Sequence, residues 1–285
     1  MVQVIHLENV PLIERQHVRE GIFCSRRILN GISGTPGNFS LQIGVTPSYY
    51  SPRHRHNFDQ VRYQLDGSFD FGADGVMKPG SIAYFPEGTY YGPQTSASAN
   101  STLVLQFGGA SGNGYVSPEQ YERASRELAK QGTFQKGVYT RVQRDGSKIN
   151  QDAYEAVWEE VNGRPLVYPR QRYLRPVFMD PKSFQWIPLA DRPGVNRKYL
   201  GQFSERRARI VFFNVAPGAW LDLEENSIYF VIQGLGAVST EDSAAPPNHF
   251  ARHTTMYLVR GNQARVSARG SEPAELLQMG LPQFA

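Results

Sequence analysis

The sequence predicts an all-β, or mainly β, protein: two blocks of short strands with a few helices between them. Its 285 residues include 27 glycines and 19 prolines, and 12% are aromatic. This composition favours short strands joined by turns over a helical bundle. Short apolar runs separated by turn residues recur early in the chain and again in its last part. The two blocks can be aligned with each other, which indicates an internal repeat.

The first block reads as a series of strands and turns. Val61, Tyr63 and Leu65 alternate with polar residues, which is typical of a strand with one buried face. Turn dipeptides follow at Asp66-Gly67 and Asp74-Gly75. The other expected strands are apolar runs, at 21–24, 39–45, 81–85 and 101–107. Short strands at this spacing predict a sandwich or a closed barrel.

Two helices are expected after the first block. Ser117 can cap the first helix, with Pro118 at its first position and Gln120 completing a capping box. The second helix is predicted over 152–161, where apolar residues fall on one face. Asn162-Gly163 stops it, because these residues readily adopt the left-handed conformation of a helix end.

The remaining segments complete the domain organisation. Residues 133–150 are polar and show no strand pattern, and the proline-rich residues 164–193 are expected to form an extended connector. The last block has strand candidates at 210–215, 227–233 and 255–259. We therefore divide the chain into a first strand block that carries the site, a helical and proline-rich connector, and a second strand block, at 1–115, 116–194 and 195–285.

Charge and cysteine content exclude several functions. The net charge is +4 and the isoelectric point is near 9.1, but lysines and arginines are scattered, so no nucleic-acid surface is expected. The single cysteine, Cys24, cannot form an internal disulfide and fits a reducing cytoplasm. The N-terminus lacks a signal pattern, and no run approaches the ~18 apolar residues of a membrane span. We expect a cytoplasmic protein with no nucleic-acid or membrane partner.

The clearest chemical signal is the spacing of residues between 54 and 91. It consists of two groups, His54-x-His56-x3-Gln60-x6-Gly67 and Gly80-x5-Pro86-x-Gly88-x2-Tyr91. In an extended chain the side chains at i and i+2 point to the same side, so His54 and His56 should face one cavity. Neutral imidazoles are the commonest metal ligands in proteins.

The second block keeps the turn pattern of the first but loses its polar residues. Gln64–Gly67 aligns with Val231–Gly234, and Phe85–Gly88 aligns with Leu258–Gly261. On this alignment the positions of the two histidines, the glutamine and the tyrosine are taken by Leu221, Leu223, Ser227 and Ala264. One site is therefore expected, in the first block.

The two groups of residues resemble the motifs of the cupin superfamily. Gln60 stands where the first cupin motif has Glu, and Tyr91 stands where the second has His. Because the resemblance extends to both blocks, it implies a bicupin: two cupin jelly-roll β-barrels, with the site in the N-terminal barrel and a degenerate C-terminal one. It also implies a divalent transition metal, Fe, Mn, Ni or Zn, held by His54, His56, Gln60 and Tyr91.

Three interpretations of the histidine pair stay open. In the first, Gln60 supplies a carbonyl oxygen and Tyr91 a phenolate oxygen to a metal that the histidines hold. In the second, the pocket is metal-free and His54 or His56 acts as a general base. In the third, the barrel is degenerate and both histidines are structural.

Strand parity adds candidates for substrate contact. If Gln60 faces inward, Arg62 and Gln64 face inward too. A buried arginine needs a partner, so we hypothesise that Arg62 pairs with a carboxylate or enolate oxygen of a small substrate. The alternative is a strand face that is open to solvent at the rim of the barrel. Tyr84 is a further candidate, as an aromatic wall of the pocket.

The resemblance implies a metal-dependent enzyme that acts on a small oxygenated organic molecule. A dioxygenase-type oxidoreductase is the first expectation, with His54, His56 and Tyr91 as catalytic residues. The alternatives are a non-catalytic small-molecule binding or sensor bicupin, and a cupin isomerase or cyclase. Bicupins can pair through their exposed faces, so a homodimer is among the expected assemblies.

Overall fold

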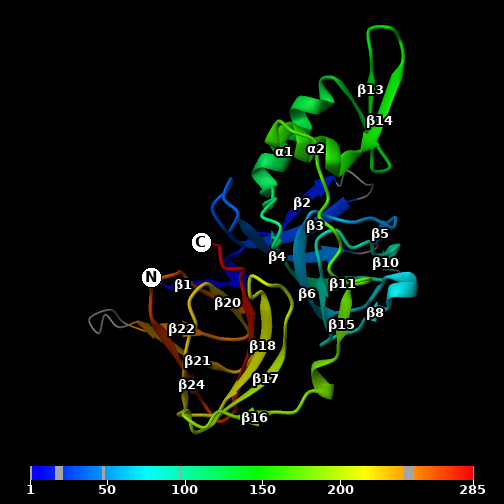
Figure 1. Ribbon diagram of the computed structural model, residues 1–285. Helices are drawn as coiled ribbons and strands as arrows, with labels where there is room; N and C mark the ends of the chain where they lie inside the picture. The colour runs from blue at the N-terminus through cyan, green and yellow to red at the C-terminus, as the bar shows by residue number, and fades with distance from the viewer. Residues whose placement is uncertain (1, 17–21, 47–48, 97, 241–246, 285) are drawn as a thin grey trace. The chain divides into compact units, whose positions relative to one another are not determined.

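The computed structural model describes residues 2–16, 22–46, 49–96, 98–240 and 247–284. Strands dominate the structure, and the prediction of a mainly β fold is confirmed. The chain divides into two compact units (Figure 1). We call residues 12–178 the first unit, and residues 1–11 together with 179–285 the second unit.

Two antiparallel sheets form the barrel of the first unit. The larger has seven strands in the order β15-β9-β6-β11-β4-β3-β2. Their bounds, in the same order, are Val177–Met179, Ile82–Phe85, Phe58–Asp66, Asn100–Gly108, Phe39–Thr46, Ile22–Asn30 and Ile13–Gln16. The smaller sheet has the order β5-β10-β7-β8, with bounds Tyr49–Ser51, Gln94–Ser96, Phe69–Asp70 and Val76–Met77. The larger sheet therefore provides the long strands across which side chains can line up.

Both expected helices are present in the first unit. Helix α1 (Pro118–Ala129) begins with the predicted capping box: Gln120 N donates to Ser117 Oγ, and Ser117 N donates to Gln120 Oε1. Helix α2 (Ala153–Asn162) ends at Gly163, which has a left-handed φ of 62°. Short 3₁₀ turns lie at Leu7–Asn9, Gly72–Asp74 and Pro181–Ser183. Across the described ranges, no helix has the length and apolar character needed to cross a bilayer.

The expectation that residues 133–150 lack strands is wrong. A three-stranded sheet, β12 (Gly132–Gln135), β13 (Val138–Val142) and β14 (Lys148–Asp152), joins the two helices. Its side chains are mostly exposed, apart from the buried Tyr139, which packs in one cluster with Leu128 of α1. Because both faces are largely polar, the period-two pattern that marks a half-buried strand is absent from the sequence.

The proline-rich residues after α2 are extended and pack on the first unit. Gly88 approaches the backbone of Pro169 closely, and Thr89 Oγ1 donates to the carbonyl oxygen of Tyr173 at 2.8 Å. Arg172 Nη2 lies 3.2 Å from a carboxylate oxygen of Glu87. The Pro86–Tyr91 motif therefore meets this part of the connector directly.

Replacing Gly88 with alanine is expected to destabilise the first unit. A Cβ at Gly88, where φ is +76°, would lie 2.4 Å from Pro169 O, whereas Gly80, at a φ of +84°, has open space around it. Gly80→Ala should cost about 1 kcal/mol for the positive φ alone. Gly88→Ala should cost about 1–3 kcal/mol more, because the backbone must shift. Urea unfolding measures both free energies, and equal losses would contradict the close packing at Gly88.

The second unit is also built from two antiparallel sheets. The seven-stranded sheet has the order β1-β23-β20-β25-β18-β17-β16, with bounds Val2–His6, Thr254–Leu258, Ser227–Gln233, Ala274–Gly280, Arg209–Val215, Val195–Gln202 and Ile187–Pro188. The four-stranded sheet has the order β19-β24-β21-β22, with bounds Trp220–Asp222, Ala264–Arg269, Leu235–Thr240 and Asn248–Phe250. Strand β1 pairs with β23, so the first strand of the chain belongs to this unit.

The core of the second unit is apolar where the first unit has its motif residues. Leu221, Leu223 and Ala264 are buried in one cluster with Tyr229 and Met256. These include the positions that the sequence alignment matched to His54, His56 and Tyr91. The apolar side chains fill the interior, which is consistent with the loss of polar chemistry expected there.

Candidate functional site

The inner face of the larger sheet in the first unit carries polar side chains in rows. One row follows the strand register through Arg27, Gln42, Val104 and Arg62. The adjacent row contains Ser25, Gly44, Thr102 and Gln64. Inner sheet faces are normally apolar, so this pattern marks the interior of the first unit as the place to look for a site.

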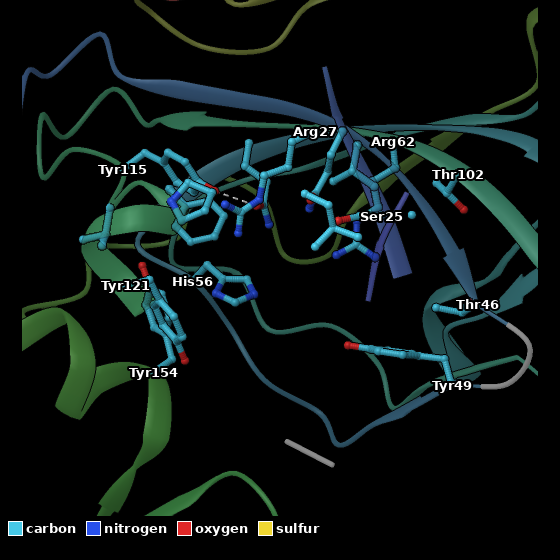
Figure 2. A pocket seen from close by; sticks show the side chains of 18 of the residues that line it. Ser25, Arg27, Thr46, Tyr49, His56, Arg62, Thr102, Tyr115, Tyr121 and Tyr154 are labelled. Atoms are coloured by element: carbon cyan, nitrogen blue, oxygen red, sulfur yellow. Dashed lines mark hydrogen bonds between the residues drawn. The ribbon is translucent and has the colours of Figure 1, made fainter. Parts of the chain in front are cut away.

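A cavity of about 690 Å³ lies against this face. Arg27, Arg62, His54, His56, Gln94 and Asn100 are among the polar residues that line it. Aromatic side chains form much of the rest, as Figure 2 shows for Tyr49, Tyr115, Tyr121 and Tyr154. The volume and the mixture of apolar walls with a few polar groups suit a small organic molecule.

Backbone pairing brings the two sequence motifs together. His54 N donates to Tyr91 O at 3.1 Å, and Tyr91 N donates to His54 O at 2.9 Å. Gly88 N donates to His56 O at 2.7 Å. The histidines thus lie on an isolated bridge and the loop after it, not on the regular strand expected, but both still line the cavity. Their ring centroids are 4.9 Å apart.

The orientation of His54 follows from its hydrogen bonds. Nδ1 lies 2.7 Å from the carbonyl oxygen of Pro52, which can only accept, so Nδ1 carries the proton. In the neutral ring Nε2 is then an acceptor, and it lies 3.0 Å from Tyr91 Oη. Tyr91 therefore donates its hydroxyl proton to His54, and its oxygen is left to accept from other groups.

Arg62 fills the space between the predicted metal ligands. Its Nε and Nη2 donate to Gln60 Oε1 at 3.2 and 2.8 Å, and Nη2 also donates to Tyr91 Oη at 3.2 Å. Nη1 donates to Gln94 Oε1 at 3.0 Å. The guanidinium carbon lies 4.6 Å from the ring centroid of Phe85. Arg62 is only 9% exposed, yet no carboxylate pairs with it among the residues that the structure describes.

Gln60 and Tyr91 lie beneath Arg62 and do not line the cavity. Both are almost fully buried. Gln60 Nε2 donates to Tyr91 Oη at 3.1 Å, so the amide oxygen of Gln60 is the atom that faces Arg62. The structure therefore brings His54, Gln60, Arg62 and Tyr91 into one hydrogen-bonded network. Gln60 and Arg62 point to the same side of their strand, as the alternation of side chains predicted. His56 lies beside it, stacked on Phe58 with centroids 4.5 Å apart.

Two predicted substrate residues lie away from the cavity. Gln64 is buried, where its amide donates to Asp66 O and accepts from Thr102 Oγ1. Tyr84 pairs in register with Val61, on the face of the sheet opposite to Arg62, and its hydroxyl donates to Asp59 Oδ2 at 2.7 Å. The expectation that Tyr84 forms a pocket wall did not use this register, which only the pairing of β9 with β6 reveals.

Several cavity residues were not predicted from the sequence. Ser25 and Arg27 lie at i and i+2 on β3, and both line the cavity. Ser25, Arg26 and Arg27 are consecutive polar residues in β3, so the sequence pattern does not show which of them face the interior. Gln94 and helix residues such as Glu122 carry no local signal either.

Comparison with known proteins identifies the fold. No family model matches the chain, and no curated protein is similar to it in sequence. A solved structure of a proposed dioxygenase from Nostoc punctiforme matches with a TM-score of 0.59 at 11% identity, covering 100% of this chain and 85% of that one. Oxalate decarboxylase from Lactobacillus farciminis, in a formate complex, gives 0.56 at 11% identity, with coverage of 99% and 87%. Oxalate decarboxylase from Bacillus subtilis, which has Mn(II) centres, gives 0.55 at 13% identity, with coverage of 99% and 78%.

The fold is a bicupin fold. At these identities the likeness concerns the fold alone, so the chemistry of this chain must be argued from its own residues. The expected jelly-roll architecture is confirmed.

The residues of this site do not fit the expected metal. Gln60 Oε1 already accepts from two nitrogens of Arg62, and Tyr91 Oη accepts from Arg62 and from Gln60. A divalent cation on these oxygens would lie beside a permanent positive charge and be repelled by it. Within the described ranges, no three His, Cys, Asp or Glu side chains form a group that could hold a metal. Of the four predicted ligands, Gln60 and Tyr91 are hydrogen-bonded to the guanidinium of Arg62, and their oxygens face it.

A second buried polar group lies on the other face of the larger sheet in the first unit. Asp59 accepts from Tyr84 Oη and from the backbone N of Glu87. Glu87 in turn accepts from Ser111 and pairs with Arg172. Burial, and then the nearby charge of Glu87, raise the pKa of Asp59 to about 7. Burial also raises the pKa of Tyr84, and Asp59 adds to the effect. This group links the connector to the barrel and does not line the cavity.

Proposed function

We propose that the first unit binds a small organic carboxylate directly, through Arg62 and without a metal. The observation that carries the proposal is a buried guanidinium at the cavity wall whose partners are amide and phenol oxygens and aromatic rings. A buried cation without an anion is unfavourable by several kcal/mol. A bound carboxylate would offset that penalty by supplying the missing negative charge.

Arg62 keeps a donor for such a ligand. A guanidinium has five N–H groups, and its hydrogen bonds to Gln60, Tyr91 and Gln94 use four of them. The fifth, on Nη1, is available to a carboxylate oxygen in the cavity. Gln60 and Tyr91 fix the orientation of the side chain, so little conformational entropy is lost when the ligand binds.

The two histidines add imidazole groups, which are the commonest general bases, to the same cavity. His56 lines the cavity and would act on a bound ligand as a general base. His54 is held between Pro52 and Tyr91 and supports the network. Proton transfer on a carboxylic acid is thus the reaction class that this set of side chains would support.

Metal-dependent oxidation is the second candidate. The likeness to a proposed dioxygenase and to a Mn(II) enzyme favours it at the level of fold. It would require Arg62 to leave Gln60 and Tyr91, so that their oxygens could turn to a metal. The two candidates therefore differ in whether ligand binding depends on metal.

Calorimetric titration of the full chain with phenylacetate and 3-phenylpropionate tests the proposal. We expect binding that is unchanged after dialysis against EDTA, because Arg62 needs no metal to hold a carboxylate. Metal analysis of protein purified without chelators should find less than stoichiometric Fe, Mn, Ni or Zn. Binding that appears only after Mn(II) or Fe(II) is added would overturn the proposal and support the oxidative candidate.

A further inference from the structure

The cavity has a second polar end, formed by Ser25 and Arg27 on β3. Ser25 is 1% exposed, and its hydroxyl has no hydrogen-bond partner in the described part of the chain. The same holds for the buried Nε of Arg27. Both residues line the cavity, and Figure 2 shows their side chains with Arg62. Buried polar atoms are nearly always paired, so these two atoms point to a ligand group.

The charge state of this end differs from that of Arg62. Arg27 Nη1 lies 3.1 Å from a carboxylate oxygen of Glu119, and Nη2 lies 2.7 Å from one of Glu122. Two carboxylates on α1 therefore already balance the charge of Arg27. Glu14 also lines the cavity. A second carboxylate on the ligand would be repelled here, whereas a neutral oxygen could accept from Arg27 Nε and exchange a hydrogen bond with Ser25.

The strand register sets the distance between the two polar ends of the cavity, at Arg27 and at Arg62. Arg27 and Arg62 share a row, with Gln42 and Val104 between them. Neighbouring strands lie about 4.8 Å apart, so the backbones of the two arginines are about 14 Å apart. Both side chains extend into the space between. A ligand that reaches both ends needs a spacer of several atoms, and Val104, Tyr49 and Phe69 present apolar surface to such a spacer.

We infer that the ligand is a hydroxy- or oxo-carboxylic acid with its neutral oxygen remote from the carboxylate. The carboxylate binds Arg62, the spacer lies along Val104, and the hydroxyl or carbonyl oxygen binds Ser25 Oγ and Arg27 Nε. This inference rests on the proposed carboxylate site and names the class of molecule that the site takes. It also assigns Ser25 and Arg27 a role in specificity.

A matched pair of acids tests the inference. In the unaltered protein, 3-(4-hydroxyphenyl)propionate is expected to bind about tenfold more tightly than 3-phenylpropionate, because the hydroxyl gains hydrogen bonds at the second end. In Ser25→Ala this advantage should fall to about twofold or less, while the affinity for 3-phenylpropionate stays the same. Ser239→Ala, an exposed serine of the second unit, is the control and should keep the full advantage.

The outcomes separate this inference from the proposed function. Equal binding of the two acids by the unaltered protein overturns the inference but leaves the carboxylate site. An advantage that survives in Ser25→Ala also overturns the role of Ser25. Failure of both acids to bind overturns the proposed function and the inference with it. Ser25→Ala removes a hydroxyl without a partner, so its thermal unfolding midpoint should not fall, which confirms that the variant is folded.

Discussion

Replacing Arg62 with glutamine is expected to weaken the binding of 3-phenylpropionate by about tenfold to a hundredfold or more. The substitution removes the only cation that contacts Gln60 and Tyr91 among the described residues. Loss of a hydrogen bond to a charged group typically costs about 1.5–3 kcal/mol, which corresponds to a loss of affinity of this size. Glutamine keeps an amide that can still pair with neighbouring oxygens, so the barrel interior should remain packed. Isothermal titration measures the affinity directly.

The same variant should be at least as stable as the unaltered protein when no ligand is present. Arg62 is a buried charge without a carboxylate partner among the described residues, so no ion pair repays its desolvation, and glutamine removes that desolvation penalty. Arg197→Gln, at an exposed position of β17 in the second unit, is the matched control and should change neither affinity nor stability. Undiminished carboxylate affinity in Arg62→Gln would exclude Arg62 as the anchoring group.

Stability is expected to fall as the pH rises from about 4 to about 7, because of Asp59. Burial raises the pKa of this carboxyl to about 7 in the folded protein, against an ordinary value of 3.8. Between these values the folded protein holds the proton and the unfolded chain has released it, so each rise in pH favours unfolding. Below the ordinary value both states are protonated, and above about 7 both are ionised. The total loss is on the order of a few kcal/mol.

Asp59→Asn should remove this contribution. Asparagine is neutral throughout and keeps an oxygen to accept from Tyr84 or from Glu87 N, which are the partners of Asp59. Urea unfolding at pH 5, 6, 7 and 8 should therefore give a flatter stability curve for Asp59→Asn than for the unaltered protein. Asp66→Asn, at an exposed position of the same strand, should retain the original slope. If the stability curves of the unaltered protein and Asp59→Asn are parallel, Asp59 is not the source of the pH dependence.

Local patterns were sufficient for part of the site. The i, i+2 spacing of His54 and His56 predicted one shared cavity, which both residues line. Parity along β6 predicted that Gln60 and Arg62 point to the same side, and they are hydrogen-bonded to each other. The capping box at Ser117 was also predictable, because a helix start depends on four consecutive residues.

Other features depend on pairing between distant strands. The face on which Tyr84 lies is set by its register with Val61, and no pattern within 81–85 contains that information. Ser25 and Arg27 reach the cavity because β3 pairs with β4. The largest difference between expectation and structure concerns Arg62. The sequence indicates that its side chain points inward, but its position between Gln60 and Tyr91 depends on the space that the other side chains leave. The spacing of the motif thus indicated residues that lie together, whereas the place of Arg62 among them depends on the packing of the whole interior.

The pairing of β1 with β23 has a consequence for the order in which the molecule can be assembled. Val2–His6 precedes the first unit along the chain, and its partner Thr254–Leu258 follows that unit. The first unit lies wholly between these strands, so it can fold on the ribosome while β1 is still unpaired. The second unit is completed only when the segments on either side of the first unit meet, which is a long-range and slow step. A change in Val2–His6 would thus affect the unit that is completed last, although this strand is made before the first unit.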